Sequence, residues 1–271
     1  MNQRLLQMRD RVRAGEHYSL RTAPVPDLIS ECQRENLTWT QRSARRTRRM
    51  CEAEMPVILP AERILFTRTI AEIPAVFSAE EYEQITSGCT LHELGPISNI
   101  CADWGRVLDN GLSNRREKAL AARQRWSADP DKVEFIDCAI ETIDAVMGLA
   151  QRYSLAAHNA GRSDLAAILA NVPAQPPRTF HEALQALRLL HAVVWMSGHY
   201  HVGLGRFDQY MYPYLAADLE SKRLDLPGAE ALLAEFFISL NKDSDLYPGV
   251  QQGDNGQTLT FSQYKEKVDR L

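Results

Sequence analysis

The chain has 271 residues, of which 45% are hydrophobic and 24% are charged, a balance that is typical of globular proteins and argues against a disordered or fibrous one. Its formal net charge of -4 and its sequence pI of about 6.0 argue against a strongly basic nucleic-acid-binding domain, so we expect no nucleic-acid partner. The length allows a substantial core but does not decide between one large domain and two small ones.

The sequence shows no signal for secretion or membrane insertion. Residues 1–13 alternate charged residues and leucines, without the continuous apolar stretch of a signal peptide. No segment approaches the roughly 20 apolar residues that a membrane helix needs. A secreted disulfide framework is not expected, because the cysteines are odd in number and form no CxxC pair: Cys32, Cys51, Cys89, Cys101 and Cys138. We therefore expect a cytoplasmic protein with no membrane partner.

A dense basic run, RSARRTRR, extends from Arg42 to Arg49 on a helix predicted between Thr40 and Met55. Such a run contacts phosphate or RNA in some proteins. It is also typical of a solvated helix face that packs against acidic surface elsewhere. The absence of an aromatic platform beside the run favours this second interpretation.

Two helices carry the clearest patterns. Residues 131–160 place apolar side chains at steps of three and four, directly after a capping pair, Asp129-Pro130. A second helix begins at Thr179, which has the capping-box spacing to Glu182. As far as Met196 this second helix is apolar on nearly every face, which predicts burial on several sides.

The remaining elements are mostly helical. Two short strands are predicted, at Arg63–Thr69 between two prolines and at His201–Leu204. Further helices are predicted at Glu80–Ser87, Arg106–Trp126, Asp208–Ser221 and Gly228–Asn241. The predicted fold class is therefore mainly α with a few strands. One or two strands cannot close a sheet, so we expect these to belong to a sheet completed by other sequence.

The residues from Gly198 to Tyr214 concentrate chemically active side chains. His199 and His201 are spaced to face the same side of a strand, as a metal or acid/base pair would. No third ligand accompanies them, and the alternative is that both are hydrogen-bonded structural groups. Gly203-Leu204-Gly205 lacks the third glycine of a dinucleotide fingerprint and favours close backbone packing instead. Arg206 and Asp208 are spaced to bond each other or neighbouring backbone.

The same stretch, HVGLGRFDQYMYPY at residues 201–214, resembles a signature of the glycyl radical enzymes, the pyruvate formate-lyase-like superfamily. Other segments agree with that family in order. PPRTFHEALQ at 176–185 resembles the family's PPxTFxEALQ helix start, and GDNGQT at 253–258 resembles its GDxGQT turn. ERILF at 62–66 weakly resembles an early strand of the family. DWGRVL at 103–108, with Gly111-Leu112, resembles the family's DYxKVLxxGL segment. The similarity runs from about Arg45 to Thr260.

The resemblance implies a ten-stranded α/β barrel of two parallel halves, jacketed by helices around a central finger loop. This chain would supply the helical jacket and the first strand or strands, as a truncated form of that fold. Residues 1–260 would be the N-terminal portion of the pyruvate formate-lyase-like domain. Residues 261–271 would be a divergent polar tail, because after Thr260 the family has an apolar residue and a glycine pair, whereas here Phe261 is followed by Ser262 and Gln263.

The resemblance also implies the chemistry. In relatives, a radical installed on a C-terminal glycine by a radical S-adenosylmethionine activase passes to a finger-loop cysteine, which abstracts hydrogen from substrate. The chain contains neither motif, so we expect no bound cofactor, no catalytic residue, no metal ligand and no activity from the chain alone. A complementary C-terminal chain would complete the enzyme, and only then would a small-molecule substrate bind.

Three positions correspond to substrate-binding positions of the resembled family. Asn99 stands where dehydratase-like members carry a histidine, four residues before the aspartate of the DYxKVL segment. Tyr200 and His201 stand where those members carry a His-Ser pair. These departures argue against a glycerol- or diol-dehydratase pocket and favour an acid or a larger polar substrate. Nearby, Cys101 is expected to be a buried, inert thiol, and Asp103 and Trp104 to be packing residues.

A different class of function remains open. The chain would then be a non-catalytic binding or scaffold protein that has kept the helical jacket. Apolar residues that face a barrel in the complete fold would be exposed, and such patches promote association. This alternative predicts self-association of the chain.

Overall fold

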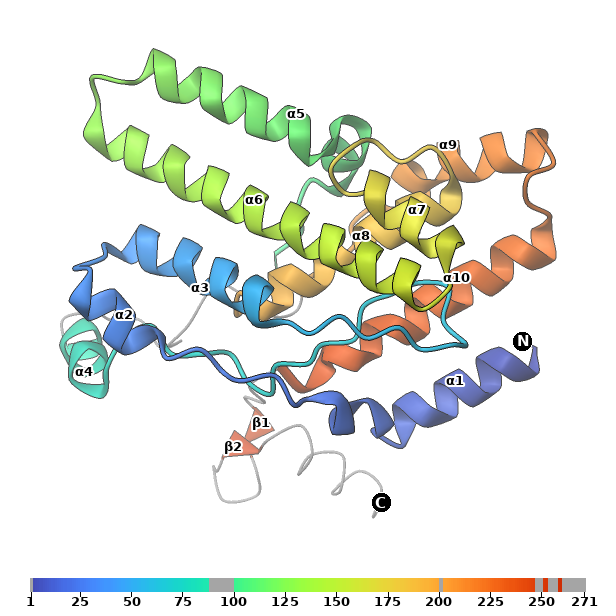
Figure 1. The fold of residues 1–271 in the computed structure, drawn as a ribbon, viewed down its shortest axis with the longest axis horizontal. Coiled ribbons are helices and arrows are strands. Elements are labelled where there is room, and N and C mark those ends of the chain that lie inside the picture. Colours follow the sequence, from blue (N-terminus) through green and yellow to red (C-terminus); the bar gives the residue numbers. More distant parts are fainter. Residues whose placement is uncertain (1, 88–99, 200–201, 247–250, 253–257, 260–271) are drawn as a thin grey trace.

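The computed structural model describes residues 2–87, 100–199, 202–246, 251–252 and 258–259. Nearly all of the elements are helices, which confirms the predicted fold class (Figure 1). In chain order they are α1 (Gln3–Arg13), η1 (Glu16–Leu20), α2 (Leu28–Arg34), α3 (Trp39–Ala53), α4 (Ala79–Ser87), α5 (Trp104–Arg125), α6 (Pro130–Asn159), α7 (Ser163–Asn171), α8 (Phe180–Met196), α9 (Phe207–Glu220), α10 (Leu226–Leu240), η2 (Asn241–Leu246), β1 (Gln251–Gln252) and β2 (Thr258–Leu259).

The predicted helices are all present, with ends that differ by a few residues. Asp129 caps α6 by accepting a hydrogen bond from the Lys132 N–H, and Pro130 lies in the first turn. The two-residue strands β1 and β2 pair antiparallel, with Gln251 opposite Leu259. The predicted polar tail, residues 261–271, lies outside the described residues. Among the residues that are described, no helix is both long and apolar enough to cross a membrane.

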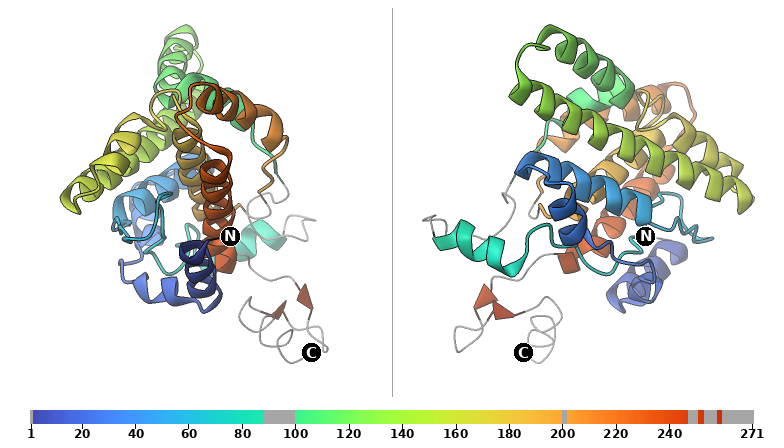
Figure 2. Two further views of the ribbon diagram at one scale, coloured as in Figure 1. Left: turned by 90° about the vertical axis from the view of Figure 1, so that its right-hand side faces the viewer. Right: turned by 60° about the vertical axis from the view of Figure 1, so that its left-hand side comes forward.

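Helix α8 lies at the centre of the helical assembly. It contacts α3, α5, α6, α7, α9 and α10, and most of its residues are buried, as its nearly continuous apolar sequence predicts. Figures 1 and 2 show α3, α5 and α6 running side by side on one face of α8. Thr179 caps α8 by accepting from the Glu182 N–H, at 3.1 Å. The Glu182 carboxylate bonds the Arg178 N–H at 2.7 Å, one residue earlier than in a standard capping box.

Helix α5 contains one position that requires glycine. Gly111 has φ of +71°, and a Cβ there would lie 2.6 Å from the Ala174 carbonyl oxygen. The bend lets the next residue, Leu112, donate its N–H to the Pro173 carbonyl at 2.9 Å. The connection between α7 and α8 is thereby fastened to the middle of α5.

The prediction of a strand at Arg63–Thr69 was wrong. The segment is buried, but within the described residues its neighbourhood contributes only one isolated bridge, between Ala23 and Ile70. Side chains of helices take the place of a neighbouring strand. Gln185 on α8 accepts from the Leu65 N–H at 2.7 Å and donates to the Leu65 carbonyl at 2.9 Å. The β-like composition of the segment therefore reflects burial rather than strand pairing.

Several other buried side chains complete this arrangement. Each bonds a backbone group of the segment, so that the buried polar groups are paired, as buried backbone requires. They are Glu235 to the Ile64 N–H at 3.0 Å, Arg188 to the Phe66 carbonyl at 3.1 Å, Tyr153 to the Thr67 carbonyl at 3.2 Å, and Glu54 to the Thr69 N–H at 2.7 Å. We call residues 63–70 the buried extended segment.

Two buried ion pairs connect the start of η2 to this core. Arg188 Nη1 lies 2.5 Å from Asp243 Oδ2, and their side chains are 0% and 1% exposed. Lys242 bonds Glu62 and also donates to Thr67 Oγ1 at 2.8 Å. Because an unpaired buried charge is costly, each pair fixes the position of the chain that follows α10.

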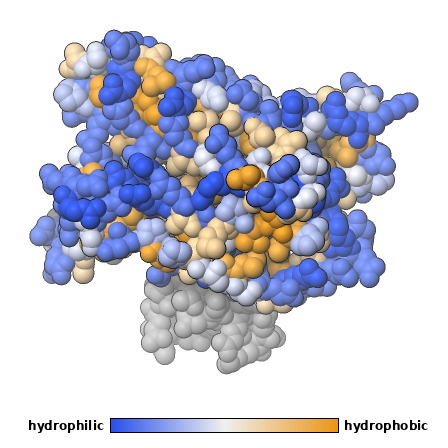
Figure 3. All heavy atoms as spheres, in the orientation of Figure 1, coloured by the Kyte–Doolittle hydropathy of each residue, from blue (hydrophilic) through white to orange (hydrophobic). Residues whose placement is uncertain are grey.

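The basic run on α3 is paired with carboxylates of this chain, which confirms the interpretation that it packs against acidic surface. Arg45 contacts Glu31, Glu35 and Glu141, so it links α3 to α2 and α6. Arg42 binds Glu81 on α4 in the same manner. Hydrophilic side chains accordingly cover this part of the molecule in the space-filling view (Figure 3).

Candidate functional site

The segments that lead into the N-termini of α5 and α9 are far apart in sequence but meet in the structure. Gly203 donates its N–H to the Ile100 carbonyl at 2.8 Å, and Gly203 and Cys101 form an isolated parallel bridge. The indole N–H of Trp104 donates to the Gly203 carbonyl at 2.9 Å. Residues 100–104 and 202–205, which we call the junction, therefore form one unit. The predicted strand at His201–Leu204 is reduced to this single bridge in its described part.

A buried histidine of α8 is hydrogen-bonded to the backbone of the junction. His191 Nε2 lies 3.2 Å from the Val202 carbonyl oxygen, which can only accept, so Nε2 carries the hydrogen. Burial lowers the pKa of His191 to about 4, which keeps the ring neutral near neutral pH. The rings of Trp104 and Trp195 flank it, with centroids 6.1 and 6.3 Å away. The imidazole is thus a neutral structural donor rather than a charged group.

The glycines of the junction allow close packing, as the sequence predicted. Gly205 has φ of +61°, and a Cβ at this position would lie 2.7 Å from Cys101 Sγ. Leu204, between the two glycines, accepts a hydrogen bond from the Tyr210 hydroxyl at 2.7 Å. The start of α9 is thereby folded back against the junction.

The charged pair of the signature lies at the surface. Arg206 donates through Nε and Nη2 to the two carboxylate oxygens of Asp208, at 3.2 and 3.0 Å. Both side chains are 69% exposed. This confirms that the two residues bond each other, and such exposed pairs contribute little to stability.

Two expectations about neighbouring residues were wrong. Cys101 was expected to be buried, but it is exposed, because the isolated bridge to Gly203 lies outside the hydrophobic core clusters of the described residues. Asp103 was expected to pack, but it is the N-cap of α5 and accepts from the Arg106 N–H at 3.2 Å. Trp104 is buried and packs in the core, as predicted.

The three predicted substrate-binding residues, Asn99, Tyr200 and His201, lie outside the described residues. Their described neighbours are joined, since Ile100 accepts the hydrogen bond from Gly203. His199 is described and donates its backbone N–H to the Val194 carbonyl at 3.3 Å, at the end of α8. In the part of the chain that the structure describes, no three His, Cys, Asp or Glu side chains are grouped so as to hold a metal ion.

Arg46 is a residue that the sequence did not single out. It lies in the middle of the basic run, but no carboxylate pairs with it among the described residues. Its Nη2 donates to the Ser197 carbonyl at 2.7 Å, at the C-terminal cap of α8, and its Nε is buried without an acceptor. Burial lowers its pKa. A guanidinium with spare donors therefore lies at the end of α8 that leads into residues 199–202.

Comparison with known proteins places this geometry in a family. A model of the pyruvate formate lyase-like family matches residues 30–262. The isethionate sulfite-lyase of Nitratidesulfovibrio vulgaris is 31% identical over 166 residues, covering 54% of this chain and 20% of that protein. A probable dehydratase of Escherichia coli, YbiW, is 27% identical over 205 residues, covering 64% of this chain and 25% of that protein.

A solved structure agrees in fold. The protein from a study of 1,2-propanediol dehydration in Roseburia inulinivorans superposes with a TM-score of 0.72 at 22% identity, over 89% of this chain and 38% of that one. The chain spans about a fifth to a quarter of the length of the curated relatives. The chain belongs to the pyruvate formate lyase-like family of glycyl radical enzymes.

Proposed function

We propose that these residues form the N-terminal portion of a glycyl radical lyase and provide one wall of its substrate pocket. The observation that carries the proposal is the family match over residues 30–262, together with the pairing of the segments next to Asn99 and Tyr200-His201. In this proposal those three residues hydrogen-bond the substrate. The junction would hold them in register, because binding groups act best when their positions are fixed beforehand.

The helical assembly would be the jacket of an α/β barrel in the complete fold. The buried extended segment would then lie beside the first barrel strands, and the two buried ion pairs at Lys242 and Asp243 would set the direction in which the chain continues. Layered folds of this kind usually bury their apolar surface by packing helices against both faces of a sheet.

We further propose that the substrate is a small organic acid. Arg46 supports this proposal, because its spare donors lie at the C-terminal end of α8, where the chain leads into the proposed pocket. A guanidinium binds a carboxylate or sulfonate through paired N–H donors. Isethionate, for which the relative from Nitratidesulfovibrio vulgaris is named, is itself such an anion.

The hydrogen-abstracting cysteine and the radical glycine would come from sequence outside these 271 residues, with the radical installed by a radical S-adenosylmethionine activase. Three of the described cysteines are buried. Burial raises the pKa of Cys51 to about 12 and that of Cys138 to about 11, which suits inert structural thiols. The chain's own contribution is then binding and orientation rather than hydrogen abstraction.

The proposal is tested by a turnover assay of the 271-residue chain with an activase and candidate organic acids. We expect no product from the chain alone, and product when a polypeptide carrying the missing cysteine and glycine is added. Within the completed enzyme, Arg46→Gln should raise KM for an acid substrate about tenfold with little change in kcat, as expected for a lost charged hydrogen bond. Arg48→Gln, which removes partly exposed ion pairs with Glu52 and Glu141 and lies away from the end of α8, is the matched control.

One observation favours a second candidate, a non-catalytic scaffold that associates through apolar surface. Met55 is 52% exposed, and Val57, Ile58 and Leu59 are partly exposed beside it. Figure 3 shows apolar side chains gathered over the loop that follows α3. If Met55→Lys converts a self-associating chain into a monomer, and no complementing polypeptide restores turnover, the scaffold function is favoured.

A further inference from the structure

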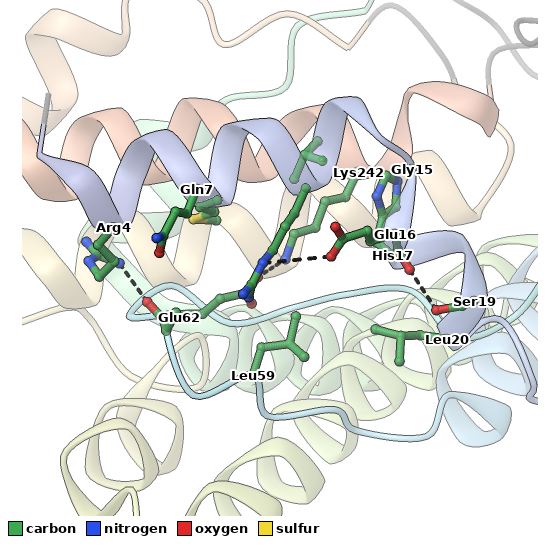
Figure 4. A pocket seen from close by; sticks show the side chains of 14 residues that line it. Arg4, Gln7, Gly15, Glu16, His17, Ser19, Leu20, Leu59, Glu62 and Lys242 are labelled. Atoms are coloured by element: carbon green, nitrogen blue, oxygen red, sulfur yellow. Dashed lines mark hydrogen bonds and ion pairs between the residues drawn. The ribbon is translucent and has the colours of Figure 1, made fainter.

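A cavity of about 540 Å³ lies beneath α1 and shares no lining residue with the junction. Its walls come from one face of α1, from η1, from the loop at residues 59–62 and from the start of η2. Figure 4 shows Arg4 and Gln7 on one side, Glu16, His17 and Ser19 on the other, and Glu62 and Lys242 between them. This volume lies within the range of ordinary small-molecule sites.

One wall is a row of hydrogen-bond donors. Arg4, Gln7 and Arg11 follow one another at steps of three and four, so they lie on the same face of α1. Arg4 uses only Nη1, on the Ala61 carbonyl and on Glu235. The nearest carboxylate to Arg11 is Glu16 at 3.8 Å, which is beyond hydrogen-bond distance. Within the described residues, both guanidinium groups therefore keep donors for an acidic group.

The rest of the cavity lining is different in character. Met8, Val12, Leu20 and Leu59 give it an apolar lining. Glu62 also lines it and is only 4% exposed; its Oε1 binds Lys242, while its Oε2 is buried with no hydrogen-bond donor in the described part of the chain. A buried carboxylate oxygen without a donor is unfavourable, so a ligand that donates a hydrogen bond there gains affinity.

The charged side chains of the lining decide which kind of hydrogen-bond donor a ligand can present to Glu62. Three cationic side chains line the cavity, Arg4, Arg11 and Lys242, against two carboxylates, Glu16 and Glu62, so a further cation would meet a lining of net positive charge. A neutral hydroxyl meets the same need without that repulsion. We propose that this cavity binds a small hydroxy acid, with its acidic group on Arg4 and Arg11, its hydroxyl on Glu62 and its apolar part against Met8 and Leu59.

Three probes of equal chain length separate these contacts: 2-hydroxyhexanoate, hexanoate and 1,2-hexanediol. Binding to the 271-residue chain is measured by isothermal titration calorimetry. We expect saturable binding of 2-hydroxyhexanoate, with hexanoate and the diol each bound about tenfold more weakly, as one lost charged or buried hydrogen bond implies. No radical and no second polypeptide is needed, so failure here leaves the proposed lyase function untouched.

Variants on α1 provide the matched control. Arg11→Gln should weaken binding of 2-hydroxyhexanoate about tenfold and leave binding of the diol unchanged, because only the acid contacts the guanidinium. Arg9→Gln, on the same helix but bonded to Asp10 and outside the cavity lining, should leave both unchanged. Val12→Trp should fill the cavity and abolish binding. Thermal unfolding shows whether each variant is folded.

Two results would overturn the site. One is the absence of saturable binding of 2-hydroxyhexanoate at millimolar concentrations to the folded wild-type chain. The other is binding that Arg11→Gln and Arg9→Gln weaken equally, because that would indicate a general attraction of anions to a basic helix. Equal affinity for hexanoate and 2-hydroxyhexanoate would contradict the role assigned to Glu62.

Discussion

The buried extended segment and the junction are both short extended stretches that lie against α8, yet they are held in different ways. Gln185 and Arg188 of α8, with side chains from other helices, bond the backbone of residues 63–70 in the interior. One turn later, His191 supports the junction, which is also held by one isolated bridge, the Trp104 indole N–H and the Tyr210 hydroxyl. Successive turns of one helix thus support a fixed core element and a lightly held, partly exposed one.

The difference shows where stability and function lie. Buried charges and paired backbone groups make the first segment costly to disturb. The junction carries the exposed Cys101, is followed directly by the exposed Arg206–Asp208 pair, and adjoins the proposed substrate-binding residues. Changes to the buried segment should therefore lower global stability, while changes to the junction should be smaller and local.

Breaking the buried ion pair should have the largest effect. Arg188→Met removes the partner of Asp243 and the donor to the Phe66 carbonyl, and it should lower the free energy of unfolding by about 3–5 kcal/mol, since it leaves a buried charge unpaired. Urea denaturation followed by circular dichroism measures the loss. The control is Arg48→Gln, which should cost less than about 1 kcal/mol because its side chain is 41% exposed. Equal losses in the two variants would remove the distinction between the regions.

Acidification should weaken the junction. The pKa of His191 is lowered to about 4 by burial, below the roughly 6.5 of an unfolded histidine, so between these values the unfolded chain binds the extra proton. Stability therefore falls as pH falls through this window, by up to about 3 kcal/mol from this residue. The measurement is the difference in unfolding free energy between wild type and His191→Gln from pH 7 to pH 4. A difference that does not change with pH would contradict a neutral buried imidazole.

The side-chain amide of Gln185 should account for much of the order in the buried extended segment. Gln185→Leu keeps a buried side chain of similar size but leaves the Leu65 N–H and carbonyl unpaired. It should therefore lower the free energy of unfolding by about 2–3 kcal/mol. Hydrogen exchange of the Leu65 amide, followed by NMR, should accelerate more than that of amides in α6. Unchanged protection at Leu65 would show that the amide contacts do not hold the segment.

The smallest effect is expected at the junction glycine. Gly205→Ala combines a positive φ with a Cβ close to Cys101 Sγ, and it should cost about 1–2 kcal/mol. Adding Cys101→Ala removes the sulfur atom and should restore part of the loss, while the backbone strain remains. A double variant no more stable than Gly205→Ala would argue against close contact between the two residues.

The sequence predicted the helices well because their signals are local. Apolar spacing and a capping pair located α6, and Thr179 located the start of α8. The state of residues 63–69 was not predictable in this way, because the side chains that bond them come from positions such as Gln185 and Glu235, more than a hundred residues later. An apolar, β-rich stretch between prolines looks the same whether a strand or a set of helices covers it.

In the candidate site too, contacts between residues far apart in sequence could not be predicted from local patterns. The motifs at 103–108 and 201–214 were identified separately, but only the structure showed that Ile100 and Gly203 are hydrogen-bonded. Arg46 was hidden inside a uniform basic run, and only its lack of a carboxylate partner among the described residues distinguishes it from Arg45. The cavity beneath α1 combines residues 4–20, 59–62 and 242, a combination that no local pattern indicates.

The most direct test of the account is reconstitution of the radical. The chain is mixed with a polypeptide that carries the finger-loop cysteine and radical glycine of a family member, then treated with an activase under anaerobic conditions, and both the glycyl radical signal by electron paramagnetic resonance and product formation are measured. We predict neither from the chain alone and both from the assembled pair. Turnover by the chain alone, or a stable assembled pair that gains a radical but never converts an organic acid, would contradict the account.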